Sequence, residues 1–303
     1  MILIAGGTGL LGTQVVRLLS ARGLSVRVLT RDPRRAQHLS GDHVETVVGA
    51  VNDRDALERA MTGTRVVISA IHGFSGTGDA NPRTVDLQGN KALIAAACRA
   101  GVEHFVLLSI HGAAADHPIE LFRMKYAAEQ AVRASGLAWT IIRPTAYMET
   151  WASLIGEPLL KTGKTRIFGS GANPINFVSA HDVAHYVAGA VQEPAMRGEG
   201  IEVGGPENLS MRQMAEAIMR VRQVRGTVSA VPLPMMRLMA VAMRPVNATL
   251  ARQIQAGIVM DTKDMSFDPT EMRRRYPSMP YTRLEEVIRR DVTERVSTSR
   301  VGM

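Results

Sequence analysis

Short apolar runs alternate with segments of helical periodicity along the first half of the chain. Residues 2–5 read Ile-Leu-Ile-Ala and stand directly before a glycine cluster, a pattern typical of a buried parallel strand. Five more runs predict strands at 25–29, 44–48, 65–70, 105–109 and 139–143. Between them, apolar residues at helical spacing predict helices such as 55–61, 84–100 and 125–135. This alternation predicts an α/β fold, a doubly wound parallel sheet with helices on both faces.

The regular alternation stops after Pro144. One-sided apolar residues predict a helix from about 147 to 154, and the glycine-rich stretch 163–173 predicts a hairpin-like connection. Farther on, the pattern predicts strands at 175–178 and 200–203, and helices at 182–192, 210–222 and 232–243. The last helix is rich in methionine, which lines adaptable apolar pockets as well as ordinary cores. These segments predict a smaller second lobe.

The glycine cluster between the first strand and the first helix fits a dinucleotide-binding turn. Gly6 allows the tight turn, Gly9 lets a pyrophosphate approach the backbone, and Gly12 lets helix and strand pack closely. The phosphates would face the positive end of the helix. The sequence therefore predicts a Rossmann-type domain with cofactor contacts from Gly6, Thr8, Gly9, Leu10, Leu11 and Gly12.

Residues at the carboxyl ends of the other strands extend this predicted site, because ligands of such sheets bind at that edge. Adenine, ribose and phosphates are expected near Ala50, Val51, Ala70, Ile71 and His72. At the end of the second strand, where NAD enzymes place a carboxylate, the chain has Thr30 followed by Arg31. An arginine there can pair with a 2′-phosphate, so NADP(H) is favoured over NAD(H), although Asp32 stands one residue farther on.

Composition and charge narrow the classes of protein. Hydrophobic residues make up 46% and charged residues 21% of the 303 residues, which is usual for a globular chain. The net charge is +8, but arginine predominates among the basic residues and is scattered, so we expect no nucleic-acid partner. A single cysteine, Cys98, excludes an internal disulfide, and no metal site is expected. No apolar stretch is long enough for a membrane span and Met1 opens no signal peptide, so a cytoplasmic protein is expected.

Several motifs taken together resemble the NmrA-like atypical short-chain dehydrogenases/reductases. They lie at residues 5–12, 125–129, 135–144, 178–184 and 204–207, and the resemblance covers roughly residues 1–225. Within that family, residues 85–90 and 109–111 are most similar to the subgroup containing photosystem II assembly factors. The resemblance implies that residues 1–150, with 175–204 returning to them, bind NADP(H) or NAD(H). It implies that residues 151–174 and 205–303 form a smaller substrate-binding lobe.

The catalytic residues of that family are only partly present. Family members carry a tyrosine four residues before a lysine that lowers the pKa of its phenol. Lys125 matches that lysine, but Leu121 stands at the tyrosine position. Ser109 matches the family serine after the fifth strand, and Asp86 replaces the asparagine of many extended members. Ser109, Lys125 and Pro144 complete the implied cofactor contacts.

Several side chains remain as proton donors in place of the missing tyrosine. Lys125 itself is one, if it acts as the acid or base. Alternatively, it holds the hydroxyls of the nicotinamide ribose. Tyr147 is the preferred alternative because it follows the sixth strand, and His111, two residues after Ser109, is another. His72 and Tyr126 are further alternatives, although Tyr126 points about 100° away from Lys125 on a helix.

Two functions fit these residues. The first is an NADPH-dependent oxidoreductase of a small apolar carbonyl, enone or quinone, with a substrate pocket formed by Tyr147, Met148, Trp151, Phe177 and the methionine-rich helix. The second is a catalytically silent NADP(H)-binding regulator, redox sensor or assembly factor. The partner is accordingly a small-molecule substrate or a protein, and the oligomeric state stays open.

Overall fold

The computed structural model describes residues 1–290, which divide into two compact units. The first unit consists of Met1–Pro144 and Val183–Val203, and the second of Thr145–Asp182 and the chain from Gly204 onward. Residues 145–150, 175–182 and 204 thus lie in the second unit, whereas the family resemblance groups them with the first. Within residues 1–290, no helix has the length and apolarity needed to cross a membrane.

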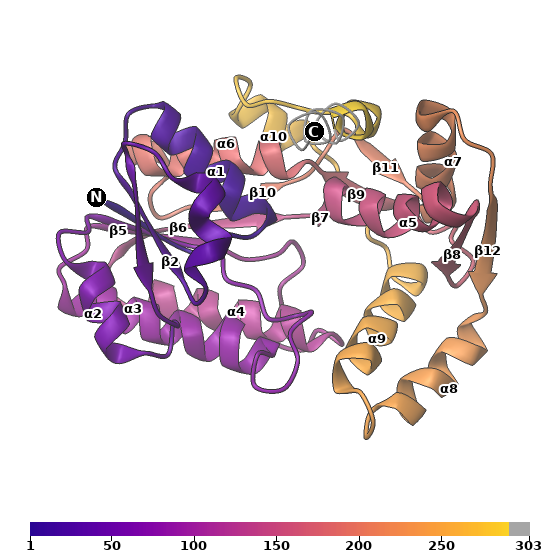
Figure 1. Cartoon of the computed structure of the whole chain (residues 1–303), viewed down its shortest axis with the longest axis horizontal. Helices are drawn as coiled ribbons and strands as arrows, with labels where there is room; N and C mark the ends of the chain where they lie inside the picture. The colour runs from indigo at the N-terminus through magenta and orange to yellow at the C-terminus, as the bar shows by residue number, and fades with distance from the viewer. Residues whose placement is uncertain (291–303) are drawn as a thin grey trace. The chain divides into compact units, whose positions relative to one another are not determined.

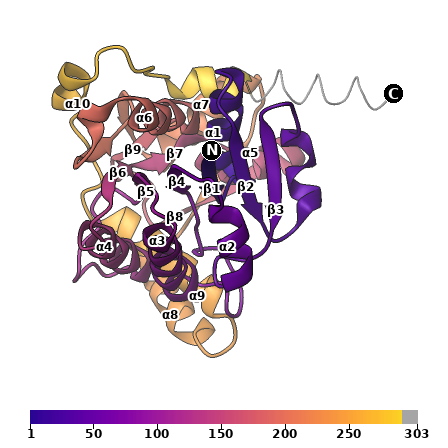
Figure 2. The same ribbon diagram turned by 90° about the vertical axis from the view of Figure 1, so that its left-hand side faces the viewer.

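The first unit contains a parallel sheet of seven strands (Figure 2). Their order across the sheet is β10-β6-β5-β4-β1-β2-β3, and every neighbouring pair is parallel. The strands are β1 (Ile2–Ala5), β2 (Val26–Thr30), β3 (Val44–Val48), β4 (Val66–Ser69), β5 (His104–Leu108), β6 (Ala138–Pro144) and β10 (Gly200–Val203). The predicted doubly wound α/β fold is confirmed. The order reverses between β1 and β4, which is where such sheets bind ligands.

Helices cover both faces of this sheet (Figure 1). One face carries α2 (Arg54–Met61), α3 (Asn90–Arg99) and α4 (Glu120–Arg133), and the other carries α1 (Leu10–Ala21) and α6 (Ala180–Gln192). Short helical segments complete the unit: η1 (Pro33–Leu39), η2 (Arg83–Gly89) and η3 (Pro194–Met196). The predicted helix 84–100 is therefore the π-helical η2 continued by α3, and the helix predicted from residue 125 begins at Glu120.

The core of the first unit explains why the strands are apolar runs. β1 and β5 are buried along their whole length, since helices pack on both faces. Leu57, Leu93 and Val132 contribute from α2, α3 and α4 to one cluster that also holds Leu3 and Phe105 from the sheet. This core fixes the carboxyl ends of the strands, where the predicted site lies.

The second unit is a smaller mixed structure. Its strands are β7 (Ala146–Tyr147), β8 (Lys164–Phe168), β9 (Ile175–Val178), β11 (Glu207–Leu209) and β12 (Thr227–Val231). Its helices are α5 (Met148–Thr162), α7 (Met211–Arg222), α8 (Leu233–Met243), α9 (Ala248–Thr262) and α10 (Thr270–Arg275), with a further helix over 284–290. β11, β9 and β7 form one small sheet, and β12 pairs with β8 in another.

The hairpin-like connection predicted over 163–173 is wrong. β8 pairs in parallel with the distant β12 rather than with a neighbouring strand. The glycines have other roles there: Gly163 ends α5 in the left-handed conformation, and Gly169 and Gly171 turn the chain after β8 with positive φ. The turn is held by Asp261, whose carboxylate accepts hydrogen bonds from the backbone N–H groups of Ser170 and Gly171.

Candidate functional site

Two of the glycines in the turn after β1 have no room for a side chain, and a third has an open side. Gly6 has φ +86°, and a Cβ there would lie 2.5 Å from the backbone oxygen of Ala70. A Cβ on Gly12 would lie 2.1 Å from the Gly6 oxygen. Gly9 differs, because its Cβ would meet only the Gly6 oxygen, at 3.4 Å. Gly6 and Gly12 are thus required by the fold, while the open side of Gly9 leaves room for a ligand.

The N-terminus of α1 is free to bind an anion. Gly9 is its N-cap and provides no side-chain hydrogen bond, and the first turn of the helix carries no acidic residue. Its first N–H groups and the helix dipole therefore offer positive potential beside the glycine turn. The geometry is compatible with the phosphates of a dinucleotide. The contacts predicted from Gly6, Thr8, Gly9, Leu10, Leu11 and Gly12 stay predictions.

The loop after β2 contains the residues that are predicted to contact the ribose, Arg31 and Asp32. The Asp32 carboxylate caps η1 by accepting the Arg34 N–H and also receives two hydrogen bonds from the Arg34 guanidinium. The bonds from Arg34 lower the pKa of Asp32 below its ordinary value. Arg31 is exposed and has no hydrogen bond or ion pair to another residue within 1–290. In this loop the Arg31 guanidinium is therefore open to a ligand, whereas the Asp32 carboxylate is already bound by Arg34.

The predicted adenine and ribose contacts lie at the ends of β3 and β4. Ala50 and Val51 follow β3 and are partly exposed, and Ala70 bonds through its N–H to the Ala5 oxygen. Ile71 is buried, and its backbone oxygen accepts a hydrogen bond from Lys125. The structure thereby brings Ala70 beside the glycine turn and Ile71 beside the family lysine.

Lys125 lies buried beneath the ends of β4 and β5. Its ammonium donates to the backbone oxygens of Ile71 at 3.0 Å and Leu108 at 2.9 Å. The ammonium also lies 3.0 Å from Asp86 Oδ1. Two backbone oxygens thus accept hydrogen bonds from the ammonium, and the Asp86 carboxylate forms an ion pair with it, although Asp86 Oδ1 accepts no hydrogen bond from residues 1–290.

Asp86 connects this lysine to the segment after β4. The carboxylate is fully buried, and its Oδ2 accepts the Gly73 N–H at 2.9 Å. His72 Nδ1 lies 3.8 Å from Asp86 Oδ1. The crowding of protein atoms lowers the pKa of His72, a shift that Asp86 opposes and Lys125 reinforces. His72 is therefore favoured in its neutral form, which makes it a poor proton donor at neutral pH.

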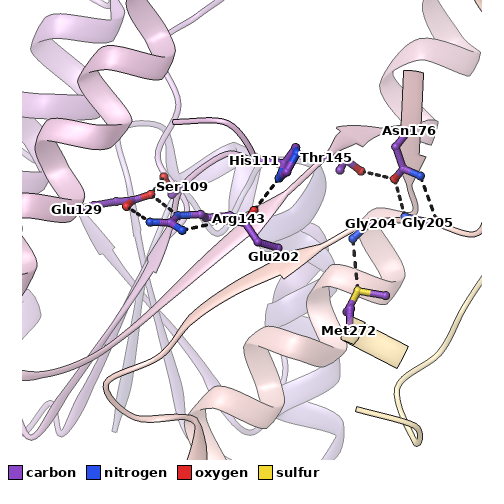
Figure 3. Close-up of polar contacts among 10 residues, drawn as sticks. All are labelled: Ser109, His111, Glu129, Arg143, Thr145, Asn176, Glu202, Gly204, Gly205 and Met272. Carbon is purple, nitrogen blue, oxygen red and sulfur yellow. Dashed lines mark hydrogen bonds and ion pairs between the residues drawn. The ribbon is translucent and has the colours of Figure 1, made fainter. Parts of the chain in front are cut away.

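Ser109, directly after β5, is bound to a carboxylate (Figure 3). Its Oγ donates a hydrogen bond of 2.5 Å to Glu129 Oε1. Glu129 is fully buried on α4 and receives two hydrogen bonds from the Arg143 guanidinium on β6, at 2.8 and 2.5 Å. Because the serine hydrogen is directed at Glu129, the hydroxyl oxygen is left as an acceptor toward a ligand.

The same arginine links this pair to His111. Arg143 also donates to Glu202 Oε1 at 2.9 Å, and His111 Nδ1 lies 2.7 Å from Glu202 Oε2 (Figure 3). Burial opposes ionisation of Glu202, but the hydrogen bonds from His111 and Arg143 lower its pKa overall. The bond to Glu129 is the main reason that the pKa of Arg143 rises above its ordinary value. A chain of paired charges therefore orients Ser109 and His111.

Glu129, Arg143 and Glu202 were missed as functional candidates by the sequence analysis. Glu129 lies one helical turn after Lys125 and thus on the same face of α4, a spacing that could have drawn attention to it. Arg143 is a charged residue in an otherwise apolar strand, a second signal. Glu202 is likewise a charged residue in a short apolar strand, but its partner was hidden because β10 joins the sheet from far along the chain.

The predicted substrate contacts all belong to the second unit. Tyr147 and Trp151 are partly exposed, while Met148 and Phe177 are fully buried in the core of that unit. Burial raises the pKa of the Tyr147 phenol, and the nearby Glu149 carboxylate raises it further. Such a phenol holds its proton firmly at neutral pH. The roles of these four residues stay predictions.

A buried amide organises the glycine-rich turn of the second unit. Asn176 Oδ1 accepts hydrogen bonds from Thr145 Oγ1 at 2.9 Å and from the Gly205 N–H at 2.8 Å (Figure 3). Its Nδ2 donates to the Gly205 oxygen at 3.1 Å. Gly205 has no room for a side chain, because a Cβ would lie 1.9 Å from the Phe177 oxygen. These contacts account for the glycine motif at 204–207 as a structural element.

Known proteins similar to this chain include reductases and assembly factors. Residues 6–194 match the family described as NAD(P)H-binding. An NAD(P)H azoreductase of Xenophilus azovorans is 32% identical over 219 residues, which are 72% of each chain. The (4-alkanoyl-5-oxo-2,5-dihydrofuran-3-yl)methyl phosphate reductase of Streptomyces griseus subsp. griseus is 35% identical over 73% of each chain. The photosystem II assembly factor Ycf39 of Synechocystis is 28% identical over 78% of this chain and 72% of its own.

A solved structure shares the fold along nearly the whole chain. The NADPH-dependent quinone oxidoreductase QOR2 of Escherichia coli, in complex with NADPH, superimposes with a TM-score of 0.77. The match covers 96% of this chain and 99% of that one, at 22% identity. At this identity the likeness concerns the fold.

Proposed function

The chain belongs to the NAD(P)H-binding family of NmrA-like atypical short-chain dehydrogenases/reductases, and from this membership we propose that it is an NADPH-dependent oxidoreductase. Its substrate in this proposal is a small, largely apolar carbonyl, enone or quinone. The observation that carries the proposal is the cluster of Lys125, Asp86 and Ser109 at the carboxyl ends of β4 and β5, the edge that binds ligands in such sheets.

NADPH is the proposed cofactor because of the loop after β2. A 2′-phosphate would meet the exposed guanidinium of Arg31, whereas a bare ribose would need a free carboxylate. Asp32 is held by Arg34 and by the cap of η1, so it does not supply that carboxylate. The glycine turn and the N-terminus of α1 would hold the pyrophosphate.

The residues around Ser109 favour a particular class of hydride acceptor. A bound nicotinamide supplies hydride transfer. An isolated ketone then needs a proton on its oxygen, but Leu121 stands at the tyrosine position and the Ser109 hydrogen is directed at Glu129. The charge on a reduced quinone or enone is delocalised and can await a proton from water or from His111. We therefore place quinones and enones before simple ketones among the substrates.

The assay that tests this proposal measures NADPH oxidation and NADPH binding in the same sample. Quinones, enones, aldehydes and ketones are compared, and NADPH is titrated by fluorescence. Turnover with quinones or enones supports the proposal. Tight binding with no turnover of any class contradicts it.

The variants for this assay must separate chemistry from folding. Replacement of Lys125 alone would leave the buried Asp86 carboxylate without its cation. Lys125→Met combined with Asp86→Asn removes both charges and is the informative variant. In the proposal it loses turnover or cofactor affinity by about tenfold or more while remaining folded by circular dichroism.

A second candidate function is a silent NADP(H)-binding regulator or assembly factor. Leu121 at the tyrosine position favours it. So do the two backbone oxygens that bind the Lys125 ammonium and the Asp86 carboxylate that forms an ion pair with it. If this is the function, we expect tight NADPH binding and no substrate-dependent oxidation of NADPH. We also expect a protein partner that binds the chain to a different extent in the presence of NADPH and of NADP⁺. The oxidation assay distinguishes the two.

A further inference from the structure

The outward face of α8 is apolar. Met235, Leu238, Met239 and Ala242 follow one another at i, i+3, i+4 and i+7, so they form one stripe along the helix. All four are exposed, Leu238 to 71%, and Val241 beside them to 63%. Val246, in the turn that follows, is 77% exposed. Together with Arg237 and Arg244, these side chains are called the α8 face below.

The opposite side of α8 is apolar as well. Met236 and Ala240 are buried and cluster with Ile254 and Ile258 of α9, the helix that packs along it (Figure 1). A helix that is apolar all round is normally buried in a core or in lipid. α8 buries only one side, so its outward stripe of large side chains is what a docking surface requires.

The charged side chains on and around α8 are all basic. Arg237 and Arg244 are exposed and lie at i and i+7, on a row that borders the apolar stripe. From residue 226 to residue 260 the chain contains no aspartate or glutamate. The next acidic residue, Asp261, holds the turn at 169–171 with its carboxylate. The α8 face is therefore complementary to an anionic surface.

We propose that the α8 face docks on the surface of an anionic lipid bilayer. α8 has 11 residues and is about 16 Å long, which is too short to span but suits a helix lying in the interface. Leu238, Val241 and Val246 would enter the boundary between headgroups and acyl chains, and Arg237 and Arg244 would bind lipid phosphates. α8 is the methionine-rich helix that the sequence predicts to line the substrate pocket, a role that stays a prediction. The docking proposal concerns the exposed side of this helix, and its test measures no turnover.

A second copy of the chain fits this face less well than lipid. In a twofold-symmetric dimer the same patch meets itself, so the arginines of both copies would come together. Residues 226–260 supply no carboxylate to compensate them. Anionic headgroups supply the missing negative charge, and acyl chains supply the apolar medium.

The test is co-sedimentation of the full chain with vesicles. Phosphatidylcholine vesicles are compared with vesicles of three parts phosphatidylcholine and one part phosphatidylglycerol. We expect binding to the anionic vesicles to exceed that to neutral ones by about tenfold or more. It should weaken strongly between about 0.1 M and about 1 M salt, where the Debye length shrinks from about 10 Å to about 3 Å.

Two double variants test the surface itself. Arg237→Gln with Arg244→Gln should reduce the partition coefficient about 25-fold, as about fivefold is expected for each cation. Leu238→Gln with Val241→Gln should reduce it about tenfold or more. Arg99→Gln with Arg166→Gln is the charge control, since both are exposed on other elements. Leu154→Gln with Leu160→Gln is the apolar control, on the exposed side of α5. Both controls should bind as the unchanged chain does.

Three results would overturn the proposal. Equal binding to neutral and anionic vesicles would show that the arginines do not act. An equal loss of vesicle binding in the charge-control variant would show that binding depends on the net charge of the chain rather than on the α8 face. No vesicle binding, together with a dimer that Leu238→Gln and Val241→Gln dissociate in light scattering, would identify the occupant as a second copy.

Discussion

Ser109 donates its hydroxyl hydrogen to Glu129 over 2.5 Å, and Arg143 holds the same carboxylate with two hydrogen bonds. The hydroxyl hydrogen of Ser109 is therefore engaged with a buried carboxylate. A ligand beside this serine would meet the lone pairs of the hydroxyl oxygen.

The first prediction concerns Ser109→Ala. Because the hydroxyl hydrogen is directed at Glu129, the hydroxyl does not protonate a substrate oxygen, and kcat for a quinone and for a ketone should each change by less than about threefold. The measurement is kcat for both substrate classes in one preparation, and an unchanged NADPH affinity is the control for folding. A loss of about a hundredfold for the ketone alone, the usual scale of acid–base assistance, would show that the hydroxyl does donate a proton to the substrate.

The second prediction concerns the buried pair of Lys125 and Asp86. Lys125→Met should lower the free energy of unfolding by about 3 kcal/mol, since Asp86 keeps the Gly73 N–H but loses its cation. Adding Asp86→Asn should restore stability to within about 1 kcal/mol of the unchanged chain. Urea unfolding of the four forms measures the coupling. If the effects of the two substitutions simply add, the pair does not act as a unit.

Local patterns were enough to predict the nucleotide-binding half of the fold. The glycine turn, the strand before it and the helix after it are contiguous, so a few residues determine the local geometry from Gly6 to Gly12. The parallel strands are apolar because helices bury both faces, which makes each run visible by itself. The sequence therefore indicated both the sheet and the edge at which a cofactor binds.

Contacts between distant segments were not predictable in this way. Arg143 meets Glu202 across 59 positions, and neither residue shows its partner in the sequence. β8 pairs with β12 rather than with a neighbour, which made the glycine-rich stretch at 163–173 look like a hairpin. The sequence does not show which strand pairs with β8, and the local glycine pattern suggested a neighbouring strand instead of β12. The same limit applies to Ser109, whose position was expected but whose bond to Glu129 was not.

The third prediction uses the open side of Gly9. Gly9→Ala should leave stability nearly unchanged, because its φ of −87° suits any residue and the nearest atom to the new methyl lies 3.4 Å away. NADPH should bind about 10 to 100 times more weakly, since the methyl keeps the pyrophosphate from the backbone N–H groups. Gly12→Ala is the contrasting variant and should unfold the turn. Unweakened binding by Gly9→Ala would place the phosphates elsewhere.

The fourth prediction concerns cofactor preference. Arg31→Ala should weaken NADPH binding about 10 to 100 times and leave NADH binding unchanged, because only NADPH carries the 2′-phosphate. Arg17→Ala, an exposed arginine on α1, is the control and should alter neither. Isothermal titration with both cofactors measures the effect. A parallel loss for the two cofactors would show that Arg31 does not contact the 2′-phosphate.

The fifth prediction follows from His104, a fully buried histidine on β5. Thr140 Oγ1 donates to the Met196 oxygen, so it accepts the hydrogen of His104 Nε2 over 2.9 Å. Nδ1 is then the unprotonated nitrogen, buried without a hydrogen-bond partner among residues 1–290. Burial lowers the pKa of His104 to about 4, and Arg197 adds to the effect. The unfolded chain, with an ordinary pKa of 6.5, therefore binds the proton more readily.

Because the folded pKa lies below the unfolded one, this histidine costs no stability above pH 6.5 and destabilises the fold as the pH falls toward about 4. The loss should reach about 2 to 3 kcal/mol and then level off, once the folded form is protonated as well. His104→Gln retains an N–H for Thr140 but does not titrate, so its unfolding free energy should lack this slope. His38→Gln, exposed on η1, should keep the slope of the unchanged chain. If His104→Gln loses stability over this window as steeply as the unchanged chain does, His104 is not the titrating group.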